Sequence, residues 1–152
     1  MGSIIAFANQ KGGVAKTTTA HTLGDAFVEM GNSVLLVDLD PQACLTYAMG
    51  VDPDTLDLTL HDVFAGRVKT EEVVVESDES PALLPSSIDL AGAEVHLLTK
   101  TGREFVLARA LKPLVDRYDY LLIDCGPSLG ILTVSYTHLR AHETTSLISY
   151  AV

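Results

Sequence analysis

The chain has 152 residues, which is enough for one globular domain with a substantial buried core. Apolar residues make up 47 % of it, which excludes a disordered protein, and no apolar run approaches the roughly 18 residues of a membrane-spanning helix. A net charge of −10 opposes non-specific attraction to DNA or to anionic lipid, so we expect no membrane partner.

The two cysteines, Cys44 and Cys125, lack the C-x-x-C spacing of a redox or zinc motif. We therefore expect two buried thiols in a reducing compartment rather than a disulfide or a metal site. The N-terminus runs directly into a predicted strand, without the pattern of a signal peptide. These features predict a cytoplasmic protein.

A glycine-containing loop joins the first predicted strand to the first predicted helix. Apolar residues 4–7 predict a buried strand, and apolar positions at helical spacing predict a helix over residues 17–30. Between them, Gly12 and Gly13 allow a ligand to approach the backbone closely, because no Cβ intervenes. Backbone N–H groups and the positive end of the helix make such a loop an anion site.

Two side chains add to this predicted phosphate site. Lys16 supplies a positive charge, and the hydroxyl of Thr17 is a hard oxygen ligand suited to Mg²⁺. The strict P-loop pattern G-x-x-x-x-G-K-[ST] fails, because Gln10 and Ala15 stand where its glycines should be. A variant with a second lysine, Lys11, is present instead. The alternative is a glycine turn with two solvated lysines, but the strand–loop–helix context favours the phosphate loop.

Two carboxylates follow the second predicted strand, residues 34–37. In an extended chain Asp38 and Asp40 point to the same side, at the strand end where open α/β sheets bind ligands. Two carboxylates beside a phosphate site suggest metal binding and water activation. The alternative is a pair of loop aspartates that start a turn before Pro41.

The rest of the chain predicts short helices that alternate with strands, and therefore an α/β fold with a parallel sheet flanked by helices. Helices are expected over residues 43–49, 58–64, 88–98 and 103–117, the last kinked at Pro113. Residues 82–87 predict a strand and its exit, and residues 120–124 predict a strand. We find no internal repeat or linker, and hence no second domain.

The last of these strands ends in Asp124, after the apolar residues 120–123. An apolar strand followed by an aspartate is the Walker B arrangement, in which the carboxylate holds Mg²⁺. Such a short pattern is weak by itself, but it is a strong signal when it follows a phosphate loop.

Residues 126–130 match the G-x-S-x-G pattern of a hydrolase nucleophile elbow. That fold needs an acid and then a histidine downstream of the serine. Here His138 and His142 precede Glu143, and no aspartate follows Ser128. We therefore assign this turn to the loop after the Walker B strand and not to a serine hydrolase.

Three motifs in the same order resemble those of the ParA/MinD superfamily, and of the ParA/Soj partition ATPases in particular. Residues 11–17 are similar to its deviant Walker A loop, KGGVGKT, with Ala15 in place of a glycine. Residues 37–42, VDLDPQ, look like its second signature. Residues 124–130 resemble DxPPSLG, with Gly126 in place of the first proline.

The resemblance implies a P-loop ATPase that binds ATP and Mg²⁺. Nucleotide contacts are implied for Lys11, Gly12, Gly13, Val14, Ala15, Lys16, Thr17 and Thr18, metal binding for Thr17, Asp38 and Asp124, and catalysis for Lys11, Lys16 and Asp40. Asp40 would orient the attacking water, and Asp38 would lie near the magnesium shell. Lys11 would reach the phosphates of the partner subunit in an ATP-bound homodimer.

The resemblance also implies a role in chromosome or plasmid segregation, with a ParB-type centromere-binding protein and non-specific DNA as partners and a nucleoid-associated location. The acidic charge of this chain argues against its binding DNA. The alternatives are a MinD-like or other deviant Walker A ATPase and an inactive nucleotide-binding fragment.

The resemblance covers about residues 4–134. We expect residues 1–134 to form an incomplete ATPase domain and residues 135–152 to be a non-native tail. The tail shifts to His, Thr, Ser and Tyr, lacks a sustained apolar period, and resembles a translated sequencing adapter. Such a tail should make few core contacts. The alternative is a divergent but genuine C-terminus.

Overall fold

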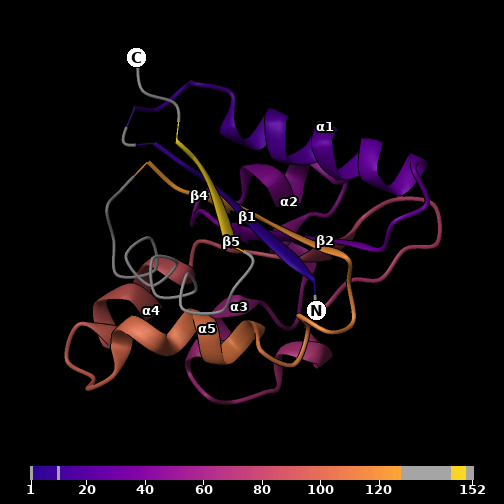
Figure 1. Ribbon diagram of the computed structural model, residues 1–152. Helices are drawn as coiled ribbons and strands as arrows, with labels where there is room; N and C mark the ends of the chain where they lie inside the picture. The colour runs from indigo at the N-terminus through magenta and orange to yellow at the C-terminus, as the bar shows by residue number, and fades with distance from the viewer. Residues whose placement is uncertain (1, 10, 128–144, 150–152) are drawn as a thin grey trace.

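The computed structural model describes residues 2–9, 11–127 and 145–149, which form a parallel five-stranded sheet in the order β3-β2-β4-β1-β5 (Figure 1). The strands are β1 (Ser3–Ala8), β2 (Val34–Leu39), β3 (Ala82–Leu84), β4 (Tyr120–Cys125) and β5 (Thr145–Ser149). The predicted parallel α/β fold is thereby confirmed.

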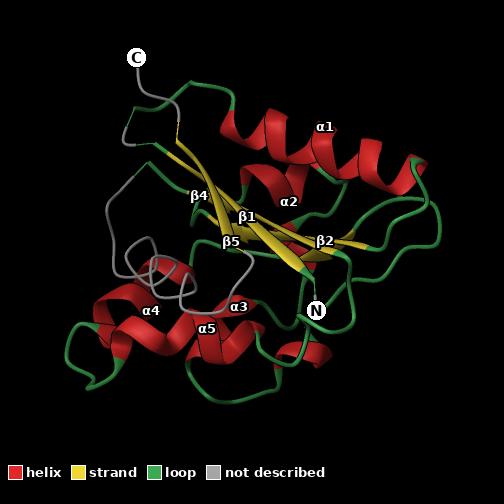
Figure 2. Cartoon of the chain, viewed as in Figure 1, coloured by secondary structure: helices red, strands yellow, loops and turns green. Residues whose placement is uncertain are grey.

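Helices cover both faces of the sheet (Figure 2). They are α1 (Lys16–Glu29), α2 (Cys44–Ala48), α3 (Leu60–Phe64), α4 (Leu90–Leu97) and α5 (Val106–Leu111), with short 3₁₀ turns at Pro53–Thr55, Thr70–Glu72 and Arg103–Phe105. Helices α1 and α2 lie on one face, and α3, α4 and α5 lie on the other. None of the helices in the described part of the chain is long and apolar enough to cross a membrane.

The central strands β2 and β4 are apolar except for one aspartate near the end of each, Asp38 and Asp124, because they are buried on both faces. Leu36 and Leu122 pack in the core under α1 and α2, whereas Leu35 and Leu121 pack in the core under α3, α4 and α5. Helix α1 lies so close to the sheet that a Cβ at Gly24 would stand 2.9 Å from the side chain of Leu36. Truncating a buried leucine of either core to alanine would cost about 2–5 kcal/mol.

The segment predicted as one helix over residues 103–117 is organised differently. A 3₁₀ turn leads into α5, which ends at Leu111, two residues before Pro113. Proline lacks a backbone N–H and its ring clashes with the preceding turn, which kinks or breaks a helix, and here the helix stops. The predicted kinked helix is therefore wrong.

Strand β5 pairs in parallel with β1, from Ile4 opposite Thr145 to Ala8 opposite Ser149. This pairing involves the backbone, so the expectation of few core contacts stays a prediction. The outer edge of β1 offers unpaired backbone groups, which an extended segment can satisfy. The rest of residues 135–152 lies outside the described residues, and their assignment as a non-native tail stays a prediction.

The two thiols differ in exposure. Cys125 is buried at the end of β4, but Cys44 is exposed at the start of α2. The expectation of two buried thiols is wrong for Cys44, because α2 turns its buried side, with Leu45 and Thr46, toward the sheet.

Candidate functional site

The loop after β1 ends in an unusual backbone conformation. Gly13 and Ala15 both adopt the left-handed region, with φ of 73° and 60°. Ala15 is the N-cap of α1, so the helix begins one residue before Thr17. Left-handed backbone costs a residue with a Cβ roughly 1–2 kcal/mol, which explains why glycine suits this position in the family the loop resembles.

The hydroxyl of Thr17 donates a hydrogen bond of 2.6 Å to Oδ2 of Asp124. This contact joins the first turn of α1 to the end of β4. Lys16, beside Thr17, is only 8 % exposed although it carries a charge. The structure therefore brings together three residues that the sequence assigned to phosphate and metal.

One carboxylate oxygen of Asp124 accepts no hydrogen bond in the described structure. This oxygen, Oδ1, is buried and has no hydrogen-bond partner among the described residues. Burial raises the pKa of Asp124 to about 7, against the hydrogen bond from Thr17, and the charges of Asp38 and Asp40 raise it further. A buried, unsatisfied carboxylate oxygen is costly unless a cation or a donor meets it.

Asp38 stands opposite Asp124 in the register of β2 and β4 and is fully buried. Its Oδ1 accepts the N–H of Asp40 at 3.0 Å, and its Oδ2 accepts the N–H and the hydroxyl of Thr46 at 2.9 and 2.8 Å. Burial raises the pKa of Asp38 to about 6, against these hydrogen bonds. Both oxygens of Asp38 thus have protein donors, whereas in the described structure only one oxygen of Asp124 has one.

Asp40 lies beyond β2, which ends at Leu39, so the extended geometry that would place it on the same side as Asp38 stops before it. Its Oδ1 accepts the N–H of Gln42 at 2.9 Å, an arrangement typical of an aspartate that starts a turn. A Cβ at Gly126 would stand 3.3 Å from the Asp40 carboxyl carbon, so the loops after β2 and β4 meet here.

Most of the remaining residues of the phosphate loop are exposed to solvent. Lys11, Gly12 and Gly13 are exposed, and a Cβ at either glycine would meet nothing within 4 Å. The N–H of Lys11 donates to the side chain of Asn9 at 2.9 Å, so its ammonium group is not part of that contact. Val14, Ala15 and Thr18 complete the loop, with Val14 half-buried and the other two exposed.

These donors fit Mg²⁺. Thr17 and Asp124 present oxygen atoms, which Mg²⁺ prefers, and one of the Asp124 oxygens has no protein partner in the described structure. No group of three His, Cys, Asp or Glu side chains in the described residues could hold a metal ion alone. A magnesium ion here would therefore need oxygens from water and from a phosphate ligand, which is its usual environment beside nucleotides.

The sequence did not point to Thr46 or Ser86. Thr46 is fully buried in α2, and its hydroxyl accepts the N–H of Ser86, from the loop after β3, at 3.1 Å. Neither residue lies in a recognisable motif. Only the meeting of the loops after β2 and β3, at the same edge of the sheet, reveals them.

Comparison with known proteins gives a family for this fold. The family model described as AAA domain matches residues 2–143. The chain is 52 % identical over 134 residues to the uncharacterized protein Rv1708 of Mycobacterium tuberculosis, covering 87 % of this chain and 42 % of that protein. It is 41 % identical over 136 residues to the sporulation initiation inhibitor protein Soj of Bacillus subtilis, covering 89 % and 54 %.

Solved structures give the same result. The chain is similar to a Mycobacterium smegmatis protein described as cobyrinic acid a,c-diamide synthase, with a TM-score of 0.85, 53 % identity, and coverage of 89 % of this chain and 55 % of that one. That protein was solved with ADP and magnesium and with an ATP analogue and magnesium. The chain spans about half the length of the relatives that it matches. It belongs to the AAA-domain family, with Soj proteins among its homologues and the fold of a P-loop NTPase.

Proposed function

We propose that this chain binds ATP with Mg²⁺ at the loop after β1 and contributes to ATP hydrolysis in a partition ATPase of the ParA/Soj type. The observation that carries the proposal is the hydrogen bond between Thr17 and Asp124, beside the buried Lys16. It joins a hydroxyl and a carboxylate at the strand ends where open α/β sheets bind nucleotides, and the charge of Lys16 acts on the same carboxylate. The nucleotide and magnesium found with the M. smegmatis protein support it.

The backbone N–H groups of residues 12–18 and the first turn of α1 would hold the phosphates, because the helix terminus is electropositive. Lys16 would add a charge-assisted bond to a phosphate oxygen, from a buried position where solvent screens little. Asp40, half-exposed at the mouth of the site, would orient the attacking water. Lys11, exposed on the loop, would reach the phosphates bound by a second copy of the chain.

Thr17 and Asp124 would hold the magnesium ion, with Asp38 in the surrounding shell because its oxygens already have protein donors. When bound, Mg²⁺ would neutralise charge on the phosphates. The protein supplies the buried carboxylates and fixes their orientation before the ion arrives.

In the cell, ATP binding would drive dimerisation, and hydrolysis would return the subunits to monomers during chromosome or plasmid segregation. A ParB-type centromere-binding protein would be the partner. The net charge of −10 argues that DNA contacts, if the complete protein makes them, do not come from these residues.

The test is Mg²⁺-dependent binding of a fluorescent ATP analogue to the 152-residue chain, followed by phosphate release from ATP with no second substrate. Lys16→Ala should lose binding, whereas Lys100→Ala, which removes an exposed lysine after α4, should bind like the unaltered chain. Unchanged binding by Lys16→Ala would overturn the assignment of the phosphate loop. Phosphate release that requires an acid substrate for amidation would favour the synthase activity named for the M. smegmatis protein instead.

A further inference from the structure

Thr46 lies in the five-residue helix α2, which follows Asp38 near the end of β2 and Asp40 just after it. Its relative exposure is 0 %, and a helix this short is held by its tertiary contacts rather than by its own propensity. Threonine is also a modest helix former, so neither burial of apolar area nor helix propensity accounts for a hydroxyl at this position.

The direction of each hydrogen bond at Thr46 is fixed by chemistry. An ionised carboxylate only accepts, so the single proton of the Thr46 hydroxyl is donated to Oδ2 of Asp38, at 2.8 Å. The hydroxyl oxygen of Thr46 accepts the N–H of Ser86 at 3.1 Å. The Thr46 hydroxyl therefore donates to Asp38 near the end of β2 and accepts from the loop after β3. A valine would have the same shape and could do neither.

The hydrogen bonds of Thr46 also affect Asp40, through Asp38. The Thr46 N–H and hydroxyl hold one oxygen of Asp38, and the other oxygen of Asp38 accepts the N–H of Asp40. The turn that carries Asp40 is thus fixed to a carboxylate whose own orientation depends on Thr46. Ser86 in turn fixes Thr46 to the neighbouring strand connection, since β2 and β3 are adjacent in the sheet.

We propose that Thr46 is a positioning residue of the nucleotide site, which orients Asp38 and through it the turn bearing Asp40. The proposal rests on the proposed function, because it assigns Thr46 a role in the reaction at that site. A small displacement of a group that positions the attacking water slows the chemical step more than it weakens binding of ATP.

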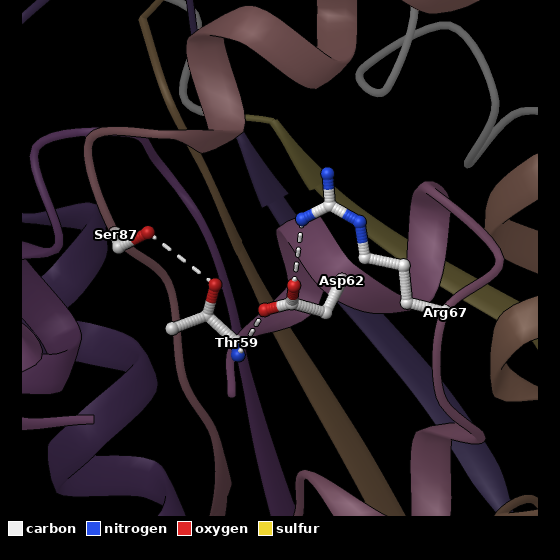
Figure 3. Close-up of polar contacts among 4 residues, drawn as sticks. All are labelled: Thr59, Asp62, Arg67 and Ser87. Atoms are coloured by element: carbon white, nitrogen blue, oxygen red, sulfur yellow. Dashed lines mark hydrogen bonds and ion pairs between the residues drawn. The ribbon is translucent and has the colours of Figure 1, made fainter. Parts of the chain in front are cut away.

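Thr59 provides a matched control. It is a second buried threonine, just before α3, and its hydroxyl lies 3.3 Å from the hydroxyl of Ser87 (Figure 3). Its N–H donates to Asp62, which also pairs with Arg67. Replacing Thr59 by valine removes a buried hydroxyl of the same kind without touching Asp38.

The experiment compares Thr46→Val, Thr46→Ser and Thr59→Val in the 152-residue chain. Thr46→Val should lower kcat for ATP hydrolysis by about tenfold or more while changing the Kd for the fluorescent ATP analogue by less than about threefold. Thr46→Ser, which keeps the hydroxyl, should restore kcat to nearly the original value. Thr59→Val should lower the melting temperature with kcat unchanged.

A second measurement does not depend on turnover. Amide hydrogen exchange of the nucleotide-free chain should be faster at Asp40 in Thr46→Val than in Thr46→Ser or Thr59→Val. If the unaltered chain binds no ATP, the proposed function fails, whereas unchanged exchange at Asp40 overturns the positioning role separately. Equal losses of kcat in Thr46→Val and Thr59→Val would also overturn it, because the effect would then be general destabilisation. If Thr46→Val does not fold, Thr46→Ala removes the same hydroxyl and is judged by the same readouts.

Discussion

Thr17 and Asp124 are 107 residues apart in the chain and are joined by a 2.6 Å hydrogen bond between the start of α1 and the end of β4. The bond occupies one oxygen of Asp124 and leaves the other buried without a partner in the described structure. Nucleotide-free protein therefore carries a carboxylate in a costly environment, which predicts a measurable effect of pH and of charge removal.

Burial raises the pKa of Asp124 from 3.8 to about 7. Between about pH 4 and pH 7, the folded state therefore keeps a proton on Asp124 that the unfolded chain has released. The contribution of Asp124 to the free energy of unfolding is greatest below about pH 4 and falls as the pH rises to about 7. Asp124→Asn should raise the melting temperature of the nucleotide-free chain by several degrees at pH 8 and by little at pH 4.5. Differential scanning fluorimetry across this range measures it.

Asp78→Asn serves as the control, since Asp78 is exposed and far along the chain from the site. Its effect on the melting temperature should not change with pH. Some dependence should remain in Asp124→Asn, because burial also raises the pKa of Asp38, to about 6. A uniform shift at all pH values in Asp124→Asn would contradict the prediction.

Ala15 and Ala43 both adopt left-handed backbone, with φ of 60° and 53°, at the start of α1 and α2. Glycine relieves a steric cost of roughly 1–2 kcal/mol there but adds about 0.4–1 kcal/mol of unfolded-state entropy, so Ala15→Gly should stabilise the chain by about 0–1.6 kcal/mol. Ala43 is buried, so Ala43→Gly should stabilise it less, because a buried methyl group is also lost. Ala26→Gly, in the interior of α1, should instead destabilise it by about 1 kcal/mol. Urea unfolding midpoints measure these changes in stability, and a loss of stability in Ala15→Gly would show that the strain is absent.

Much of this site could be predicted because its elements are local patterns. Buried parallel strands are continuous apolar runs, and carboxylates at their ends meet at one edge of the sheet, so Asp38 and Asp124 could be placed together. Thr46 could not, because its role depends on how a short helix packs against two loops. The end of α5 before Pro113 was misjudged because the choice between a kink and a stop depends on tertiary packing.

Gly126 stands where the resembled motif has a proline, and a Cβ there would lie 3.3 Å from the carboxyl carbon of Asp40. Gly126→Ala should therefore displace Asp40 and lower kcat, with little change in the Kd for the ATP analogue. Gly92→Ala is the matched control, since a Cβ at Gly92 would meet nothing within 4 Å. Equal kcat values for Gly126→Ala and the unaltered chain would show that the Asp40 turn adapts without consequence.

Asp40→Ala should bind the ATP analogue normally and hydrolyse ATP about 10²–10⁴-fold more slowly, because the role proposed for this carboxylate is to act on the attacking water rather than on bound phosphate. Stopped-flow binding and phosphate release separate the two effects. Weakened binding with turnover intact would place Asp40 among the ground-state contacts instead.

Lys11 is exposed on the phosphate loop, and its expected role lies in the site of a second copy. Lys11→Ala should keep ATP binding and lose turnover, since a cation supplied in trans accounts for about 10³–10⁵ in the rate of related reactions.

Mixing the two inactive variants, Lys11→Ala and Asp40→Ala, tests whether Lys11 acts in the site of the partner subunit. In a mixed dimer, the Lys11→Ala subunit keeps its own Asp40 and receives Lys11 from its partner, so one of the two sites is complete. Random pairing should restore about one quarter of the original turnover, because half of the dimers are mixed and each has one complete site. No recovery on mixing would mean that Lys11 acts within its own subunit or not at all.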